Sequence, residues 1–535
     1  MSLLDDLKMY PRLAWRLMNF LRNPITLERA RGIIRQLLEE REDNFLRLLK
    51  RAIFDNPKSP YLPLLELAGC EFGDIELMVK RNGLLNTLKA LREAGVYVTY
   101  EEFKGRHPIV RNGKVFQPKY NDFDNPLYKP DYYSQSGGST GAGTQVRNGF
   151  DLVADISAHE LVTSHAHGVL DVPIGLWRGI LPDNSGIGNV LRAARFGRYA
   201  KKWFSPVGLY EVNSFLLKYH LTTLLMVTLG WAAGKPLPFP RKAGLNQPDL
   251  VLDWIYKTLK TEGACLVYAP ASRALRVCVR AWERGIDLTG ATFRIAGEPI
   301  TPAKVRGITR AGAKIITTYG FAEIGRIGMG CNNPIEANDL HLCEGMCALL
   351  QYPRIVPGTD ITVQAFNFTS LHPSAFKILL NAECDDYGVV EKRRCGCPLE
   401  ELGLTTHLRE ISSFQKLTGE GMTLVGSDMI EILEEKLPSR FGGSPLDYQL
   451  MEEEDENGFT RISLLVSPGV KIENENEVIN FVYNSLENSS DMADTTQAVW
   501  KQAGTLRVKR MEPIWTGRGK LMSLYVAKRY RQGSS

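Results

Sequence analysis

Strand-like and helix-like segments alternate along this chain, and that alternation limits its possible folds more than any other feature. Apolar side chains recur at helical spacing through residues 30–52 and 83–93. Short apolar or β-branched runs occupy residues 96–99, 265–268, 313–316, 361–363 and 462–466. Strands separated by helices assemble into a parallel sheet with helices on its faces. The sequence therefore predicts the α/β class.

The length and a change of texture predict two domains. The 535 residues exceed the ~250–300 at which a single hydrophobic core stops growing. After residue 408 the long alternation gives way to a smaller unit with helical segments, two strand-like runs and a basic tail. We expect a large multi-layer N-terminal domain over residues 1–408, with an N-terminal helical extension, and a smaller α+β C-terminal domain over residues 409–535.

Composition and charge exclude several classes of protein. Hydrophobic residues make up 44% of the chain and charged residues 23%, which is typical of a soluble globular protein. The net charge of +5 is small for this length and argues against a protein dedicated to nucleic acids. The nine cysteines are scattered and odd in number, which is typical of a reducing compartment, and we expect the cytoplasm.

Three segments bear on membranes. The N-terminus has early acidic residues and no apolar core with a cleavage site, so it is not a secretory signal. Residues 221–233 form the longest apolar run, which is too short to span a bilayer and is expected to form a buried helix. Residues 3–22 mix apolar side chains with four cations. Packing of this helix on its own domain is the favoured interpretation, and binding to a membrane surface is the alternative.

A loop of glycines and hydroxyl side chains occupies residues 136–144 (SGGSTGAGT). Glycine allows close backbone approach, so successive N–H groups can converge on an anion, and hydroxyls add donors without bulk. No Gly-Lys-Ser/Thr follows, so the loop is not of the Walker type. The loop predicts a polyphosphate site, and a flexible linker is the alternative. Its candidate binding residues are Ser136, Gly137, Gly138, Ser139, Thr140, Gly141 and Thr144.

Three further segments follow in order, at residues 293–300 (FRIAGEPI), 317–323 (TTYGFAE) and 516–520 (TGRGK). Together with the glycine-rich loop, they resemble the motifs of the adenylate-forming superfamily, which includes acyl- and aryl-CoA ligases, luciferases and peptide-synthetase adenylation domains. The Thr at position 144 is similar to the phenylacetate-CoA ligase branch. The resemblance covers residues 60 to 525 or so.

The resemblance implies an activity as well as a fold. A carboxylic acid would attack the α-phosphorus of ATP, release pyrophosphate and form an acyl-adenylate, with the C-terminal domain acting as a mobile lid. Coenzyme A is the expected acceptor, which makes the chain an acid–thiol ligase of the AMP-forming type. An amine or a carrier protein is the alternative acceptor. A non-catalytic binding protein on a degenerate ligase scaffold is the alternative of another class, because Ala322 replaces the usual Thr and Ser412-Ser413 replace an acidic pair at the hinge. The acid and the oligomeric state stay open, with a homodimer among the alternatives.

The same resemblance assigns roles to individual residues. Lys520 would be the catalytic lysine of the lid. Glu323 would hold Mg²⁺ through its carboxylate. Asp386 would bind the ribose. The other expected ATP-binding residues are Gly297, Glu298, Pro299, Thr318, Tyr319, Gly320 and Arg409.

Four further side chains have the chemistry of a metal centre. Thiolates and an imidazole at Cys331, His341, Cys395 and Cys397 are a donor set that suits tetrahedral Zn²⁺. Some phenylacetate-CoA ligase-like proteins carry a similar set that holds a structural zinc. Scattered reduced thiols are the alternative, and Cys343 and Cys384 are competing ligands.

Overall fold

The computed structural model describes most of the chain. The described residues are 3–135, 145–209, 217–298, 300–355, 362–413, 416–419, 422–425, 432–443, 445–456, 459–487, 500–514 and 524–526. The glycine-rich loop at 136–144, Pro299 and Lys520 therefore lie outside the described residues.

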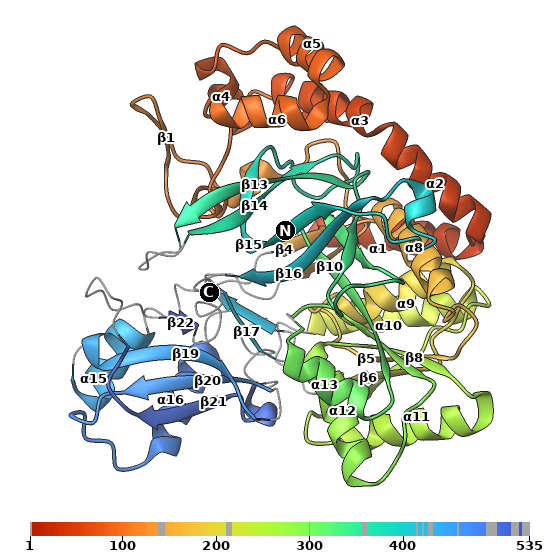
Figure 1. Cartoon of the computed structure of the whole chain (residues 1–535), viewed down its shortest axis with the longest axis vertical. Coiled ribbons are helices and arrows are strands. Elements are labelled where there is room, and N and C mark those ends of the chain that lie inside the picture. Colours follow the sequence, from red (N-terminus) through yellow and green to blue (C-terminus); the bar gives the residue numbers. More distant parts are fainter. Residues whose placement is uncertain are drawn as a thin grey trace.

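A mixed sheet forms the centre of the large domain (Figure 1). Its parallel half has the order β10-β9-β8-β5-β6-β7 and its antiparallel half the order β13-β14-β15-β16-β12-β11-β10. The parallel strands are β5 (Ile174–Trp177), β6 (Lys202–Ser205), β7 (Pro240–Lys242), β8 (Cys265–Ala269), β9 (Ala291–Ile295) and β10 (Lys314–Phe321). The antiparallel strands are β11 (Gly325–Gly330), β12 (Leu340–Leu342), β13 (Cys347–Ile355), β14 (Thr362–Ser370), β15 (Ala382–Lys392) and β16 (Thr406–Ser413).

Both faces of the sheet are buried in the middle of its parallel half, and this explains the unbroken apolar sequence of β8. In β8 all five residues are buried. Leu266 and Tyr268 enter the core under one set of helices, whereas Cys265 and Val267 enter the core on the opposite face. The first set is α8 (Phe150–Ala166), α9 (Ser185–Arg195) and α10 (Leu217–Ala232), and the second is α11 (Pro248–Glu262), α12 (Ala271–Glu283) and α13 (Pro302–Arg310).

The N-terminal extension is helical, as expected. Helix α1 (Leu3–Arg22) buries Leu13, Leu17 and Phe20 in the core that it shares with α8 and α10. Packing of this segment on its own domain is therefore confirmed. The next helices run from the side of α8 toward the antiparallel end of the sheet (Figure 1). They are α2 (Leu27–Glu39), α3 (Arg41–Leu48), η1 (Leu49–Phe54), α4 (Leu62–Leu67), α5 (Phe72–Asn82), α6 (Leu84–Glu93) and α7 (Tyr100–Phe103). Two hairpins follow, β1 (Ile109–Arg111) with β2 (Lys114–Phe116), and β3 (Tyr132–Gln135) with β4 (Gln145–Asn148).

One expected strand is wrong. Residues 96–99 form only a single bridge, between Val98 and Ala382. The reason is that Thr99 already caps α7, since its hydroxyl accepts from the backbone N–H of Glu102 while the carboxylate of Glu102 accepts from the N–H of Thr99. This reciprocal capping box starts a helix and ends any extended segment. The strands expected at 265–268, 313–316 and 462–466 are confirmed as β8, β10 and β20 (Thr460–Val466).

A small sheet in the order β21-β20-β19-β22 forms the C-terminal unit. Its other strands are β19 (Tyr448–Glu454), β21 (Leu506–Arg510) and β22 (Leu524–Val526), with helices α15 (Leu437–Phe441) and α16 (Glu475–Glu487). The hairpin of β17 (Lys416–Gly419) and β18 (Met422–Val425) precedes it. The ammonium of Lys304 on α13 donates to the hydroxyl of Thr460 at 3.0 Å, so the two units touch there. The expected fold class, a large α/β domain with a smaller C-terminal α+β unit, is confirmed, and β16 runs across the expected boundary at residue 408.

Among the described residues, no helix has the length and apolar character that a membrane crossing requires.

Candidate active site

A cavity of about 200 Å³ opens where the two halves of the large sheet meet. It lies at the carboxyl ends of β9 and β10, beside β15 and β16, which is where ligands bind in sheets of this type. Six residues from three separate sequence motifs line it, namely Gly297, Glu298, Thr318, Tyr319, Gly320 and Asp386. The tertiary structure therefore brings together side chains that the sequence places up to 89 residues apart (386 − 297).

Tyr319 and Asp386 are directly connected inside this cavity. The hydroxyl of Tyr319 donates to Oδ2 of Asp386 at 2.6 Å, and the hydroxyl of Ser413 donates to Oδ1. Burial, followed by the neighbouring carboxylate of Asp386, raises the pKa of Tyr319 well above its ordinary value. The phenol therefore stays protonated and acts as a donor that fixes the carboxylate. A carboxylate is an acceptor for hydroxyl groups of the kind that a ligand carries.

The Tyr-Gly pair has a steric reason. At this point β10 turns into β11 through an irregular register between Tyr319 and Gly320. A β-carbon on Gly320 would lie 2.1 Å from the carbonyl oxygen of Gly325, so no larger residue fits without moving the strand. Gly320 thus allows the close approach that turns the ring of Tyr319 toward Asp386.

Glu298 lines the cavity, and its side chain is held in place by residues of α12 and α13. Its carboxylate accepts from the hydroxyl of Ser272 at 2.7 Å, at the start of α12, and lies 3.7 Å from the ammonium of Lys304. The side chain itself is fully buried. Negative charge at a helix N-terminus is stabilised by the backbone dipoles, so Glu298 holds the wall of the cavity against α12.

Glu323 lies close in sequence but does not line the described cavity. Its Oε1 accepts from the ammonium of Lys104 at 3.0 Å and from the hydroxyl of Tyr120 at 2.9 Å. Burial alone would raise the pKa of Glu323, but Lys104 and Tyr120 outweigh it and lower the pKa to about 2. An ammonium therefore occupies the place beside Glu323 that a metal cation would need, and the side chain as placed does not fit Mg²⁺. Its role as a magnesium ligand stays a prediction.

Arg409 also points away from the cavity. Its guanidinium donates to both carboxylate oxygens of Glu391, at 3.1 and 3.2 Å, and to Glu336 at 3.0 Å. The residues of β16 that do line the cavity are Ile411, Ser412 and Ser413. The sequence did not predict Ser413 as a residue of the cavity, although Ser412-Ser413 at the altered hinge could have indicated it. Asn338 was missed with no motif to reveal it.

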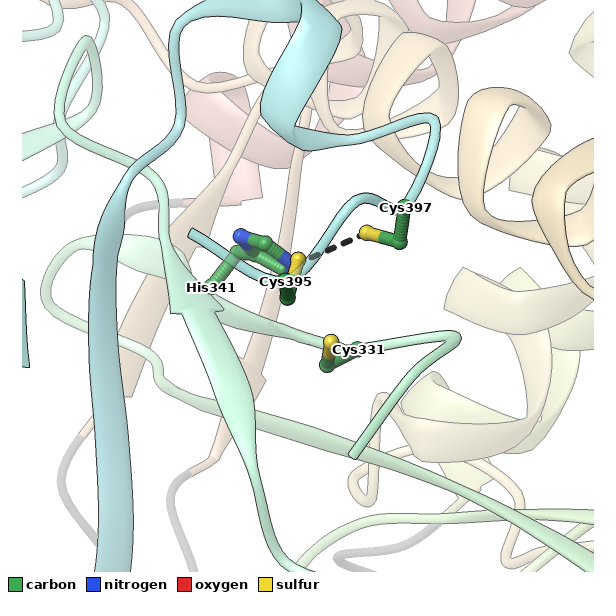
Figure 2. Close-up of side chains that lie close together, drawn as sticks. All are labelled: Cys331, His341, Cys395 and Cys397. Atoms are coloured by element: carbon green, nitrogen blue, oxygen red, sulfur yellow. Dashed lines mark hydrogen bonds between the residues drawn. The ribbon is translucent and has the colours of Figure 1, made fainter. Parts of the chain in front are cut away.

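The four expected metal ligands meet at one point (Figure 2). Cys331 follows β11, His341 lies on β12, and Cys395 and Cys397 belong to the connection between β15 and β16. Their ligand atoms all lie within 4.8 Å of one another. Nε2 of His341 is 3.1 Å from Sγ of Cys397 and 3.6 Å from Sγ of Cys395.

The surroundings of this cluster orient the ligands. Nδ1 of His341 lies 2.7 Å from the carbonyl oxygen of Leu404, so Nδ1 carries the proton and Nε2 faces the thiols, as in metal-bound histidines. One carboxylate oxygen of Glu400 accepts from the backbone N–H groups of Cys395 and Gly396, both at 2.7 Å. This closes the Cys-Gly-Cys turn. Three sulfurs and one imidazole in this arrangement fit tetrahedral Zn²⁺. In the described part of the chain, neither Cys343 nor Cys384 joins the group.

His159, Trp177 and Trp203 are core residues. Nδ1 of His159 lies 2.8 Å from the carbonyl oxygen of Asp155, and burial lowers the pKa of His159 to about 4. The indole N–H groups of Trp177 and Trp203 donate to the carbonyl oxygens of Ala243 and Arg178. None of the three lines the cavity described above.

No family model and no curated protein matches this sequence. Solved structures do match it. A 2-hydroxyisobutyryl-CoA ligase solved with 2-HIB-AMP and CoA superposes with a TM-score of 0.56, at 14% identity, over 92% of this chain and 90% of that chain. The chain has the fold of the adenylate-forming enzymes.

Other solved structures match with TM-scores below 0.5. Among them are the o-succinylbenzoate CoA synthetase from Bacillus subtilis (TM-score 0.40, 9% identity, 73% of this chain and 67% of that chain) and a variant of an amide bond synthetase from Marinactinospora thermotolerans (TM-score 0.39, 11% identity, 95% and 97%). The assignment of the fold therefore depends on the first structure.

Proposed function

We propose that this protein is an ATP-dependent ligase that activates a carboxylic acid as an acyl-adenylate and passes the acyl group to coenzyme A. The observation that carries the proposal is the meeting of residues 297–298, 318–320 and Asp386 around one cavity at the junction of the two half-sheets. These residues come from motifs that resemble those of adenylate-forming enzymes, and the chain has that fold.

The chemistry explains why such residues would be needed. A carboxylate is a poor electrophile because its leaving group would be oxide. Attack on the α-phosphorus of ATP expels pyrophosphate and makes AMP the later leaving group. Charge builds on the phosphates during this in-line transfer, so the protein must supply position and donors.

The described residues supply the nucleotide-binding part of this scheme. Asp386 accepts from the ribose hydroxyls, and the hydroxyl of Tyr319 keeps its carboxylate in place while the ring flanks the adenine. The loop at 136–144 would hold the β- and γ-phosphates, and Lys520 would approach the α-phosphate. No step of the proposal depends on magnesium held by Glu323, because Lys104 and Tyr120 already occupy its Oε1.

We also propose that Cys331, His341, Cys395 and Cys397 bind one Zn²⁺. The ion would have a structural role, because its ligands connect the end of β11, β12 and the β15–β16 connection. These elements carry the antiparallel wall of the cavity. A closed set of four protein ligands leaves no position for a substrate.

A non-catalytic binding protein is the second candidate, and two observations favour it. Ala322 lacks the hydroxyl of the usual Thr, and the carboxylate of Glu323 is neutralised from within the protein. Such a protein would bind a nucleotide in the same cavity without turnover. The fold is equally compatible with an amine or a carrier protein as acceptor, and the phenylacetate-CoA ligase branch, the cytoplasm and a homodimer remain predictions.

The test is hydroxylamine trapping with ATP and a panel of aromatic and fatty acids, together with release of pyrophosphate. A hydroxamate with at least one acid supports the ligase, and thioester formation on adding coenzyme A identifies the acceptor. Calorimetry with ATP separates the two candidates. Binding without hydroxamate or pyrophosphate from any acid favours the binding protein, and absence of both binding and turnover refutes the nucleotide site.

A further inference from the structure

Helix α10 exposes large apolar side chains along one side. Leu217, Leu221 and Trp231 are 49%, 52% and 57% exposed, and they repeat at intervals of four and ten residues, along one side of the helix. The opposite side is buried and carries Met226 and Val227 in the core. A surface helix ordinarily has polar side chains on its outer side, so the outer apolar side of α10 needs an explanation. The helix expected to be buried over residues 221–233 is buried on one side only.

The polar side chains on the buried side of α10 are all hydrogen-bonded. The hydroxyls of Thr222 and Thr223 donate to carbonyl oxygens of the same helix, those of Lys218 and Tyr219, at 2.9 and 3.1 Å. Nδ1 of His220, which is 3% exposed, lies 3.0 Å from the carbonyl oxygen of Leu209, outside the helix. This contact and the burial of Met226 and Val227 keep the side with Leu217 and Leu221 in solvent.

The apolar side of α10 continues into the segment that follows it. The indole N–H of Trp231 donates to the carbonyl oxygen of Leu237 at 2.8 Å. The polar atom of this side chain is thus already paired, while the ring stays in solvent. Two residues further on, Phe239 is 49% exposed. Phe239 directly precedes β7, the edge strand of the large sheet, which pairs with β6.

Cations surround this surface. Residues 212–248 contain no acidic residue and four cations, Lys218, Lys235, Arg241 and Lys242. On the paired strand, the register of Trp203 with Pro240 places the exposed Lys202 opposite Phe239. Helix α1 packs against α10 and exposes Trp15 to 68%. Leucine and tryptophan mixed with lysine and arginine is the composition of a surface that lies in the headgroup region of a bilayer.

We propose that the face formed by Leu217, Leu221, Trp231 and Phe239 with its flanking cations docks on the surface of an anionic phospholipid bilayer. Burial of the apolar side chains among the acyl chains and attraction of the cations to anionic headgroups act together at such a surface. A second copy of this chain is a poorer occupant, because a two-fold contact would bring two faces of the same positive charge together. The docking does not depend on the proposed ligase activity.

The experiment is flotation of the full chain with vesicles of phosphatidylcholine, with and without phosphatidylserine. The wild-type protein should float with the vesicles that contain phosphatidylserine, and added salt should release it. The substitutions Leu221→Ala and Trp231→Ala should each weaken binding about tenfold. The substitutions Lys202→Gln and Arg241→Gln should each weaken it about fivefold.

The matched control is Trp282→Ala. Trp282 is 56% exposed, lies on α12 over the opposite face of the sheet, and has its ring covered by Arg310 at 4.1 Å. This variant should bind like the wild type. All the substituted side chains are exposed, so each variant should fold, and an unchanged unfolding temperature checks this. If an apolar variant fails to fold, the two cation variants test the proposal instead.

Three results would overturn the proposal. Equal binding to neutral and anionic vesicles, or no binding to either, would show that this face does not dock on an anionic bilayer. Full binding by both Trp231→Ala and Leu221→Ala would place the contact elsewhere. A wild-type dimer in light scattering that Trp231→Ala converts to a monomer would assign this face to a second copy.

Discussion

The hydroxyl of Tyr319 donates a hydrogen bond of 2.6 Å to the carboxylate of Asp386, across 67 residues of sequence. This hydrogen bond connects the end of β10, in the parallel half of the sheet, to β15, in the antiparallel half. Both halves line the cavity at this point. Two side chains with weak individual motifs thereby meet at the proposed nucleotide site.

Removal of this hydrogen bond should weaken nucleotide binding. Tyr319→Phe keeps the ring but loses a bond to a charged group that contributes about 1.5–3 kcal/mol, so the Kd for ATP should rise by about tenfold or more. Calorimetry measures this. Tyr352→Phe is the control, because the hydroxyl of Tyr352 is buried without a hydrogen-bond partner and lies outside the cavity. An unchanged Kd in Tyr319→Phe would separate Tyr319 from the nucleotide.

The ion pair of Lys104 and Glu323 should make the folding stability of the protein depend on pH in the acid range. The pKa of Glu323 is lowered to about 2 in the folded state, so the pair stabilises the protein above the ordinary carboxyl pKa near 4.5. That stabilisation is lost as the pH falls from there toward 2. Lys104→Met leaves the buried carboxylate of Glu323 without its ion-pair partner and should cost about 3–5 kcal/mol at neutral pH.

Urea unfolding at pH 7 and pH 4 checks this prediction. The deficit of Lys104→Met should shrink at pH 4, because the unpaired carboxyl can then take up a proton. Lys80→Met is the control, since its pair with Glu76 is 65% and 40% exposed and should contribute less than about 1 kcal/mol. Equal stability of Lys104→Met and the wild type at pH 7 would contradict the role given to the pair.

Metal analysis should find about one zinc per chain, and a chelator should lower the unfolding temperature. Cys395→Ser or His341→Ala should lose the ion, because each removes one of four ligands whose atoms lie within 4.8 Å of one another. Cys70→Ser is the control, because Cys70 lies outside the cluster. A folded, metal-free wild-type preparation would refute the zinc site.

Gly320→Ala should distort the turn between β10 and β11. The added β-carbon would lie 2.1 Å from the carbonyl oxygen of Gly325. Because this oxygen belongs to the backbone, only a shift of the backbone can relieve the clash. We expect ATP binding to be lost and the unfolding temperature to fall. Gly32→Ala on α2 is the control, because nothing lies within 4 Å of its β-carbon, and it should stabilise the protein by about 0.5–1 kcal/mol. A Gly320→Ala variant with wild-type ATP affinity would show that the turn tolerates the methyl group.

Lys520→Ala should slow release of pyrophosphate by about a hundredfold or more, and change ATP affinity little, because a point charge near the α-phosphate acts mainly on the transition state. Lys501→Ala is the control, an exposed lysine of the same C-terminal unit. Equal rates in Lys520→Ala and the wild type would remove this residue from the reaction.

The sequence by itself determined the α/β class, the strands β8, β10 and β20, six of the residues that line the cavity, and the four residues of the Cys/His cluster. These follow from local patterns, because glycine content, apolar periodicity and ligand chemistry are properties of short segments. Only the tertiary structure decided which partners those residues meet. It paired Glu323 with Lys104, turned Arg409 to Glu391, gave Asp386 the hydroxyl of Ser413, and left Leu217 and Leu221 of α10 exposed. Such pairings depend on contacts between residues far apart in sequence, and the free energy of packing the whole sheet selects them, which no short segment encodes.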